Sequence, residues 1–217
     1  MPRIRRFIAC LALCCLALAA MPAAAQPLKQ DVDYRVIPQQ PVQTGDKIEV
    51  IDVFWYGCPY CNELQPYLER WRKNMPGDVA LRRVPAVRHD NWGPHARIFY
   101  TLEALGELER LHLAVYRSYH VEELYMSKPD VMVDWAVKHG IDRDKWLAAY
   151  NSPEVTQKIE QAKEFTRTYD IHGTPSFVVD GRYLTSTSMT PNVPAVLGVL
   201  DGLIKMARKE RAEKSSK

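Results

Sequence analysis

Residues 47–73 have the sequence KIEVIDVFWYGCPYCNELQPYLERWRK, and this stretch decides the fold. Its first part, Lys47–Tyr56, is β-branched and aromatic with few polar interruptions, which is typical of a central strand covered on both faces. From Pro59 to Lys73 the apolar side chains recur at helical spacing, and Pro66 predicts a kink in that helix. The stretch therefore predicts a buried strand that leads through a short turn into an amphipathic helix, with both cysteines where the helix begins.

The rest of the chain extends this unit on both sides. The further elements expected are a short extended segment at Tyr34–Ile37, a strand at Val79–Val87, four or five helices between Arg88 and Phe165, a strand hairpin at Ser176–Thr187 with its turn at Asp180-Gly181, and a helix at Val193–Arg211. Because a parallel pair of strands needs a helical crossover, the first half is predicted to be β-α-β. We therefore expect an α/β fold in which β-α-β is followed by an all-helical insertion and then by β-β-α. The predicted boundaries are 1–25 for a leader, 26–87 and 166–217 for the two parts of the α/β domain, and 88–165 for the helical insertion.

The leader has the pattern of a secretory signal peptide. Three arginines precede an apolar run from Phe7 to Ala20, which is about 14 residues long where a membrane span needs ~20. Small residues follow this run, and we expect cleavage after Ala25. The alternatives are an uncleaved membrane anchor and a lipid anchor on Cys14 or Cys15.

The charge of the chain is balanced once the leader is removed. Of the 29 basic residues, three lie in the leader, so the remaining 26 equal the 26 acidic residues in number. The mildly basic pI of 8.5 therefore comes from the leader and does not indicate binding to nucleic acid or to a membrane surface. We expect no nucleic-acid partner, and a monomer.

The number and spacing of the cysteines indicate a redox-active pair and not a disulfide that stabilises the fold. Three of the five cysteines belong to the leader, which leaves Cys58 and Cys61. An exported protein that is stapled by disulfides normally has several cysteines at longer separations. A loop of about four residues closed by this pair contributes only ~1.9 kcal/mol, against ~4.7 kcal/mol for a hundred-residue loop. The pair is therefore predicted to be a redox centre.

The two cysteines are expected to differ in role. Pro59 favours the first position of the helix, because it lacks an N–H group and has a fixed φ. Cys58 then lies at the N-cap, near the free N–H groups of Tyr60 and Cys61 and the positive end of the helix dipole. Because these features stabilise a thiolate, we expect Cys58 to have a lowered pKa and to be the attacking thiol. We also expect it to be exposed. Cys61 lies on the apolar face, and we expect it to be buried and to act as the resolving thiol.

Half of a zinc site is the main alternative for a Cys-x-x-Cys pair. A zinc site would need a second such pair or two closely spaced histidines. No other cysteine remains outside the leader, and the six histidines are scattered. We expect no metal and no cofactor.

Asp52 interrupts the buried strand six residues before Cys58. Burial of a carboxylate without a partner is costly and raises its pKa. Beneath a dithiol, however, such a group can take and return the proton of Cys61. The alternative is an aspartate at the strand end that reaches water, and we favour the proton relay.

The segment before the predicted hairpin, Ile171-His172-Gly173-Thr174-Pro175, is the third element of the site. Only ~5–6% of X-Pro bonds in folded proteins are cis. A Gly-Thr-Pro turn that enters a strand in this topology is nevertheless where we predict a cis bond. Such a bond would aim the Thr174 backbone at the dithiol and leave it free to pair with an extended substrate peptide.

These motifs resemble those of the thioredoxin superfamily. The residues that carry the resemblance are Asp52, Trp55, Cys58 and Cys61, Pro66, Thr174 and Pro175. The export signal and the helical insertion make the chain similar, more specifically, to the DsbA family of periplasmic dithiol oxidases. The resemblance implies a thioredoxin fold, a substrate mixed disulfide on Cys58, and a substrate groove bordered by Thr174 and Pro175. It also implies exported polypeptides as substrates and a membrane quinone-linked reoxidase of DsbB type as a partner.

Two residues depart from the DsbA pattern, which has Pro-His between the cysteines and a glutamate as the buried acid. Here the dipeptide is Pro59-Tyr60, and the acid is Asp52. We expect an oxidase that donates its disulfide to newly exported polypeptides. One alternative is a periplasmic isomerase or reductant, although residues 26–46 are too short for the N-terminal dimerisation domain of the known isomerases. The second alternative is a non-enzymatic module that binds peptides or metal.

The pKa of Cys58 sets the direction of electron transfer. Closure of the Cys58–Cys61 loop favours the oxidised form by ~1.9 kcal/mol. A thiolate whose pKa is lowered from about 8.5 favours the reduced form. At pH 7 the two effects balance when the Cys58 pKa is about 5.6, and we predict a value below this threshold.

Overall fold

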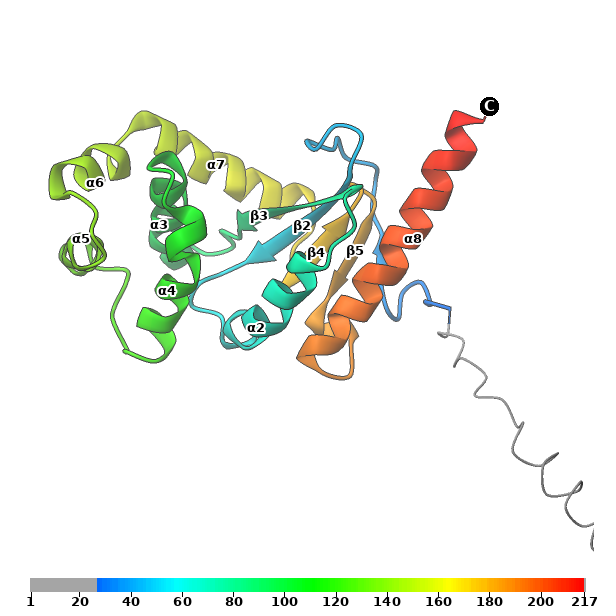
Figure 1. Cartoon of the computed structure of the whole chain (residues 1–217), viewed down its shortest axis with the longest axis horizontal. Helices are drawn as coiled ribbons and strands as arrows, with labels where there is room; N and C mark the ends of the chain where they lie inside the picture. Colours follow the sequence, from blue (N-terminus) through cyan, green and yellow to red (C-terminus); the bar gives the residue numbers. More distant parts are fainter. Residues whose placement is uncertain (1–26, 217) are drawn as a thin grey trace, which may run out of the picture.

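A computed structural model of the chain describes residues 27–216 (Figure 1), so the predicted signal peptide lies outside the described residues. The strands are β1 (Arg35–Val36), β2 (Ile48–Phe54), β3 (Val79–Pro85), β4 (Ser176–Val179) and β5 (Tyr183–Ser186). They form one sheet in the order β1-β5-β4-β2-β3. The β2–β3 pair is parallel and the β4–β5 pair is antiparallel, as the β-α-β and hairpin patterns predict. The β1–β5 and β2–β4 pairs are also antiparallel.

The stretch that decides the fold forms the elements that its pattern predicts. All seven residues of β2 are buried. Helix α2 covers Pro59–Lys73, with Pro66 inside it. Cys58 is the N-cap residue of α2, with extended backbone angles, and Pro59 is the first helical residue. The dithiol thus lies where a central strand passes into the positive end of a helix.

Helices alone follow β3 until β4. They are α3 (Gly93–Ala104), α4 (Leu108–His120), α5 (Pro129–Lys138), α6 (Arg143–Tyr150) and α7 (Pro153–Thr168), with a short 3₁₀ turn at Asp90–Trp92. The Ser152 hydroxyl caps α7 by accepting a hydrogen bond from the Val155 N–H at 3.2 Å. Helix α7 continues three residues beyond the predicted boundary at Phe165. The Thr166 hydroxyl accepts a hydrogen bond from the Val87 N–H, which ties this last turn to the chain after β3.

The last third of the chain forms the predicted hairpin and helix. Asp180 and Gly181, with φ of 54° and 65°, make the turn between β4 and β5. After a 3₁₀ turn at Val193–Ala195, helix α8 covers Val196–Ser215, so it ends four residues later than predicted. The Arg211 guanidinium binds the Asp180 carboxylate and the carbonyls of Asp46 and Lys47. These contacts hold the end of α8 on the sheet.

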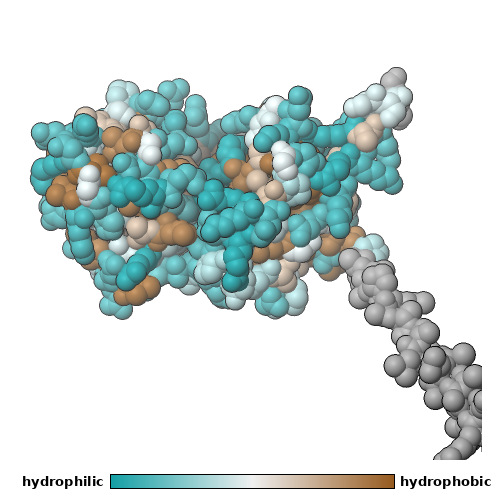
Figure 2. Space-filling model, in the orientation of Figure 1, coloured by the Kyte–Doolittle hydropathy of each residue, from teal (hydrophilic) through white to brown (hydrophobic). Residues whose placement is uncertain are grey.

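Two hydrophobic clusters cover the two faces of the sheet, because alternate strand residues point to opposite sides. Ile51 and Val53 of β2 pack with α7 and the helical insertion. Ile48 and Val50 pack with α2 and α8. In Figure 1, α2 and α8 lie across the front of the sheet, and α3 to α6 lie at one end of it. Hydrophilic side chains dominate this face of the molecule, with apolar groups in small patches (Figure 2).

Candidate active site

The two cysteines are free thiols on either side of the first turn of α2. The Cys58 Sγ donates a hydrogen bond to the Thr174 carbonyl at 3.1 Å. Only 6% of Cys58 is exposed, against 1% of Cys61. The expectation of an exposed Cys58 is therefore wrong, because the loop before β4 lies against its sulfur. Cys58 remains the more accessible of the two thiols.

The environment of Cys58 favours its thiolate. A hydrogen bond from the Cys61 thiol is the main reason that the pKa of Cys58 falls to about 6. Partial burial opposes this shift, and the backbone N–H groups of Tyr60 and Cys61 at the start of α2 support it. The direction agrees with the prediction from the sequence. The value lies slightly above the threshold of about 5.6.

Cys61 has the opposite environment. Burial raises its pKa well above the ordinary value, and the neighbouring Cys58 and the charge of Asp52 add to this effect. The Gln65 amide donates a hydrogen bond to the Cys61 carbonyl at 3.3 Å, one turn along α2. A thiol in such a place is a poor nucleophile until a base removes its proton.

Asp52 is the ionisable group placed to serve as that base. It lies in the middle of β2 and is 1% exposed. Its Oδ2 is buried and has no hydrogen-bond partner among residues 27–216. Burial raises its pKa to about 7, and the positive charge of Arg83 only partly opposes this shift. The carboxyl group can therefore gain or lose a proton near neutral pH, and the alternative of a strand-end aspartate that reaches water is wrong.

The loop before β4 borders the dithiol. The Thr174–Pro175 peptide bond is cis, as predicted from the sequence. Both residues line a groove of about 630 Å³ together with Tyr60, whose side chain is well exposed. The groove continues along the β5 side of the sheet past Ser186 and Met189. Cys58 does not line the groove itself, and its Sγ meets the groove wall at the Thr174 carbonyl.

Aromatic and histidine side chains close the other side of the dithiol. The Tyr56 hydroxyl and the His112 Nδ1 are 2.8 Å apart, and the His120 Nε2 is 2.8 Å from the Tyr56 carbonyl. The buried Tyr116 ring lies 4.9 Å from that of Tyr56. Burial raises the pKa of Tyr116, and the charge of Cys61 adds to this shift. The sequence analysis gave these side chains of α4 no role, since no motif or spacing distinguishes them.

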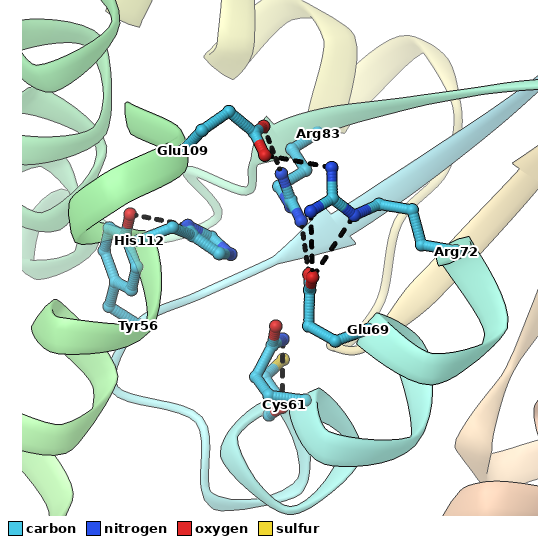
Figure 3. A network of polar contacts seen from close by, with 8 residues as sticks. Tyr56, Cys61, Glu69, Arg72, Arg83, Glu109 and His112 are labelled. Carbon is cyan, nitrogen blue, oxygen red and sulfur yellow. Dashed lines mark hydrogen bonds and ion pairs between the residues drawn. The ribbon is translucent and has the colours of Figure 1, made fainter. Parts of the chain in front are cut away.

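Four charged residues form a closed ring of ion pairs above Cys61 (Figure 3). Arg83 of β3 pairs with Glu69 at 2.7 Å and with Glu109 at 3.0 Å. Arg72 pairs with the same two carboxylates, each at 2.9 Å. The sequence analysis missed this ring. Only the spacing of Glu69 and Arg72, three residues apart on one helix, indicated a contact.

Among the residues that the structure describes, no three His, Cys, Asp or Glu side chains are grouped so as to hold a metal ion. Within the same part of the chain, no helix is both long and apolar enough to cross a membrane.

Comparisons with known proteins agree with this geometry. Residues 78–194 match the DSBA-like thioredoxin domain family. The thiol:disulfide interchange protein DsbA of Azotobacter vinelandii is 38% identical over 168 residues, which cover 77% of this chain and 78% of that protein. The protein of the same name from Burkholderia cepacia is 34% identical over 84% of this chain and 86% of its own length. The crystal structure of Pseudomonas aeruginosa DsbA superposes with a TM-score of 0.78 at 34% identity, covering 84% of this chain and 94% of that chain.

The family model matches from residue 78, after the dithiol, through the helical insertion, and the two curated relatives each cover more than three quarters of the chain. The relatives are thiol:disulfide interchange proteins, which leaves the alternative of a non-enzymatic binding module without support. The chain therefore belongs to the DsbA-like thioredoxin family and is a thiol:disulfide oxidoreductase.

Proposed function

We propose that the protein is a periplasmic dithiol oxidase that donates its Cys58–Cys61 disulfide to newly exported polypeptides. The observation that carries this proposal is the Cys58 sulfur at the N-cap of α2, with a pKa lowered to about 6, beside the groove at Thr174 and Pro175. At pH 7 a thiol with this pKa is about nine-tenths ionised, so Cys58 is a good leaving group as well as a good nucleophile.

The proposed reaction begins with the oxidised protein. A substrate thiolate attacks the Cys58 Sγ, the bond to Cys61 breaks, and Cys61 leaves with the electron pair. A second substrate thiolate then attacks the substrate sulfur of the mixed disulfide and releases Cys58 as a thiolate. The substrate loses two electrons and gains a disulfide, and the protein gains both electrons as a dithiol.

Asp52 is proposed as the proton relay for Cys61. The departing Cys61 thiolate is buried, so it needs a proton at once. A carboxyl group with a pKa of about 7 is partly protonated at neutral pH and can supply it. In the reverse step, when Cys61 attacks a mixed disulfide, the Asp52 carboxylate accepts the same proton.

The groove is proposed as the substrate site. Thr174 and Pro175 lie along its wall, and Tyr60 lies at the end nearest the dithiol. An extended peptide there would pair with the Thr174 backbone and present its cysteine to Cys58. Side-chain recognition would be loose, which suits an enzyme that oxidises many different polypeptides.

The cell biology of the protein is part of the same proposal. The leader at residues 1–25 would direct export and be cleaved after Ala25, and the mature protein would act as a monomer in the periplasm. A membrane quinone-linked partner of DsbB type would take the electrons from the Cys58–Cys61 dithiol. The predicted boundaries at 26–87, 88–165 and 166–217 stay proposals for the domain organisation.

A reductant or isomerase with the same dithiol is the second candidate. The observation that favours it is that the Cys58 pKa of about 6 is close to the threshold of about 5.6 and not far below it. The absence of a positive charge at Tyr60 acts in the same direction, since a cation there would stabilise the thiolate.

A transfer assay separates the two candidates. The oxidised protein is mixed in equal amounts with a reduced, unfolded protein that has two cysteines, without any other oxidant. An oxidase transfers its disulfide nearly completely, and the thiols of Cys58 and Cys61 appear as the substrate thiols disappear. If most of the disulfide stays on the protein at equilibrium, the reductant is the better assignment.

A further inference from the structure

Arg83 and Asp52 are neighbours in the sheet but do not bind each other. They are register partners on the parallel strands β2 and β3, so both side chains leave the same face of the sheet. Adjacent strands are only ~4.8 Å apart, and the Arg83 side chain is 7% exposed. An arginine so close to a buried carboxylate is normally its partner. The Asp52 Oδ2 nevertheless has no partner in the part of the chain that the structure describes.

Two glutamates account for this separation. The Arg83 Nη2 donates to the Glu69 Oε1 at 2.7 Å, and its Nη1 donates to the Glu109 Oε1 at 3.0 Å. Both ends of the guanidinium are thus held by carboxylates other than Asp52. Figure 3 shows the Arg83 head group between the two glutamates, with Glu69 on the side of the ring that faces Cys61. We call Glu69 and Glu109 the carboxylate clamp.

The clamp is assembled from both parts of the fold. Glu69 belongs to α2, the helix of the dithiol, and Glu109 belongs to α4 of the helical insertion. Arg72 binds the second oxygen of each glutamate, so the four charges of the ring sum to zero. The neutral ring leaves little net positive charge for Asp52 to pair with. It therefore permits a carboxyl group in the middle of β2 to stay protonated near neutral pH.

The other groups around Asp52 cannot replace this effect. They are Cys61 on α2, Tyr56 after β2, Tyr116 on α4 and the apolar Phe177 on β4, and His112 of α4 lies near Arg83. Burial keeps the two tyrosines and His112 uncharged at neutral pH, because it raises the tyrosine pKa values and lowers that of His112. Arg83 is thus the cation that opposes the effect of burial on the pKa of Asp52.

We propose that Glu69 and Glu109 are positioning residues that hold the Arg83 guanidinium away from Asp52 and so keep Asp52 available as a proton relay. The relay itself rests on the proposed function, whereas the effect of the clamp on Asp52 does not. Loss of either glutamate frees part of the guanidinium to turn toward Asp52. The pKa of Asp52 then falls, and a larger share of the carboxyl group is ionised at neutral pH.

The direct test is a carbon-13 NMR titration of the Asp52 carboxyl group in the oxidised protein, where neither thiol titrates. Asp52→Asn identifies the signal. Glu69→Gln is expected to lower the pKa of Asp52 by about one unit, and Glu109→Gln by about half a unit. Glu107→Gln is the matched control, because Glu107 precedes the same helix but pairs with Arg110. It should leave the pKa unchanged.

A double-mutant cycle shows whether Glu109 acts through Arg83. In an Arg83→Met background, Glu109→Gln should no longer shift the pKa of Asp52. If this variant does not fold, Arg83→Lys takes its place, since an ammonium group cannot hold two carboxylates in the same way. The effect of Glu109→Gln should then shrink. If Glu109→Gln still shifts the pKa of Asp52 by the full amount in either background, Glu109 acts on Asp52 through its own charge and not through Arg83, and the proposal is overturned.

Kinetics of mixed-disulfide resolution separate the clamp from the relay. If the relay and the clamp are both right, the pH profile of resolution moves down with the pKa of Asp52 in both glutamate variants. A lowered pKa with an unchanged profile would retain the clamp and reject the relay. If Asp52→Asn slows resolution but neither glutamate variant shifts the pKa, the relay stands and the clamp is wrong.

Discussion

Cys58 and Cys61 lie one helical turn apart and have opposite chemistry. The start of α2 and the Cys61 thiol stabilise the thiolate of Cys58, whereas burial keeps Cys61 protonated. In the proposed reaction, Cys58 is therefore the thiol that reacts with substrates, and Cys61 reacts only with Cys58. This asymmetry would give an order to the exchange, since the substrate would always be attached through the same sulfur.

The division of roles predicts different outcomes for the two serine variants. Cys61→Ser should accumulate mixed disulfides with substrate through Cys58, because the resolving thiol is gone. Cys58→Ser should be inert. Alkylation of the reduced wild-type protein at pH 7, followed by mass spectrometry, should label Cys58 well before Cys61. Faster labelling of Cys61 would contradict the assignment.

Asp52→Asn should slow the attack of Cys61 on a mixed disulfide near neutral pH and affect formation of that disulfide less. Stopped-flow measurement across pH 5–9 checks this, with Asp46→Asn as a control at the exposed residue before β2. Rates that match the wild type across this range would leave Asp52 without a catalytic role.

The same variant should also change stability. Burial raises the pKa of Asp52 from 3.8 to about 7, so the group costs the folded protein stability as the pH rises through that interval. The free energy of unfolding of Asp52→Asn should therefore exceed that of the wild type at pH 7 and above. The two should converge only below about pH 3, where the carboxyl group is protonated in both the folded and the unfolded state. A constant difference at all pH values would indicate a cause other than ionisation.

The sequence allowed Asp52, Cys58 and Cys61 to be identified because they belong to one short strand, turn and helix whose local pattern places all three. It did not allow the clamp to be identified. Arg83 follows another arginine on an edge strand, and Glu109 lies on an exposed part of a helix, so both have the pattern of ordinary solvated charges. Their contact depends on how α4 packs against α2, which no local periodicity specifies.

At the scale of elements, the hairpin β4–β5 positions the groove, because β4 begins directly after Pro175. Its turn needs a glycine at residue 181. Gly181 has a φ of 65°, and an added Cβ would collide with the Gln40 carbonyl. The turn was predictable, since Asp-Gly is a strong hairpin signal. The extension of α8 to Ser215 was not, because it depends on Arg211 contacts with distant segments.

Two glycine variants test the conformation of the β4–β5 turn, because they should change the free energy of unfolding in opposite directions. Gly181→Ala should lower the free energy of unfolding by about 1–2 kcal/mol, because alanine is strained at positive φ and meets the Gln40 carbonyl. Gly198→Ala, inside α8 with nothing within 4 Å of its Cβ position, should raise it by about 0.5–1 kcal/mol. Urea denaturation measures both. Equal effects of the two changes would show that the turn is not held in this conformation.

At the scale of the whole molecule, the helical insertion does more than cover one end of the sheet. It supplies Tyr116 and His112 to the wall of the dithiol and Glu109 to the ring of ion pairs. The class of fold and the existence of this insertion were predictable, since element type follows from periodicity. The side chains that it directs toward Cys61 were not, because they come from packing between parts that are far apart in sequence.

The central claim is that the protein is an oxidase, and its reduction potential tests this most directly. The thiolate of Cys58 stabilises the reduced form fully above its ordinary pKa of about 8.5, and this stabilisation is lost as the pH falls through about 6. Between about pH 6 and about pH 8.5, the reduction potential relative to glutathione should therefore become more oxidising as the pH rises. Tyr60→His should make it more oxidising still at pH 7, by placing a cation beside the thiolate.

The measurement is the equilibrium fraction of the Cys58–Cys61 disulfide in glutathione buffers of defined ratio at pH 7. An oxidase of exported proteins needs a potential less negative than about −180 mV, the value of an enzyme that works in an oxidising compartment. We predict a value above this limit. A value near −230 mV or below, in the range of glutaredoxins and thioredoxins, would contradict the account and assign the protein as a reductant.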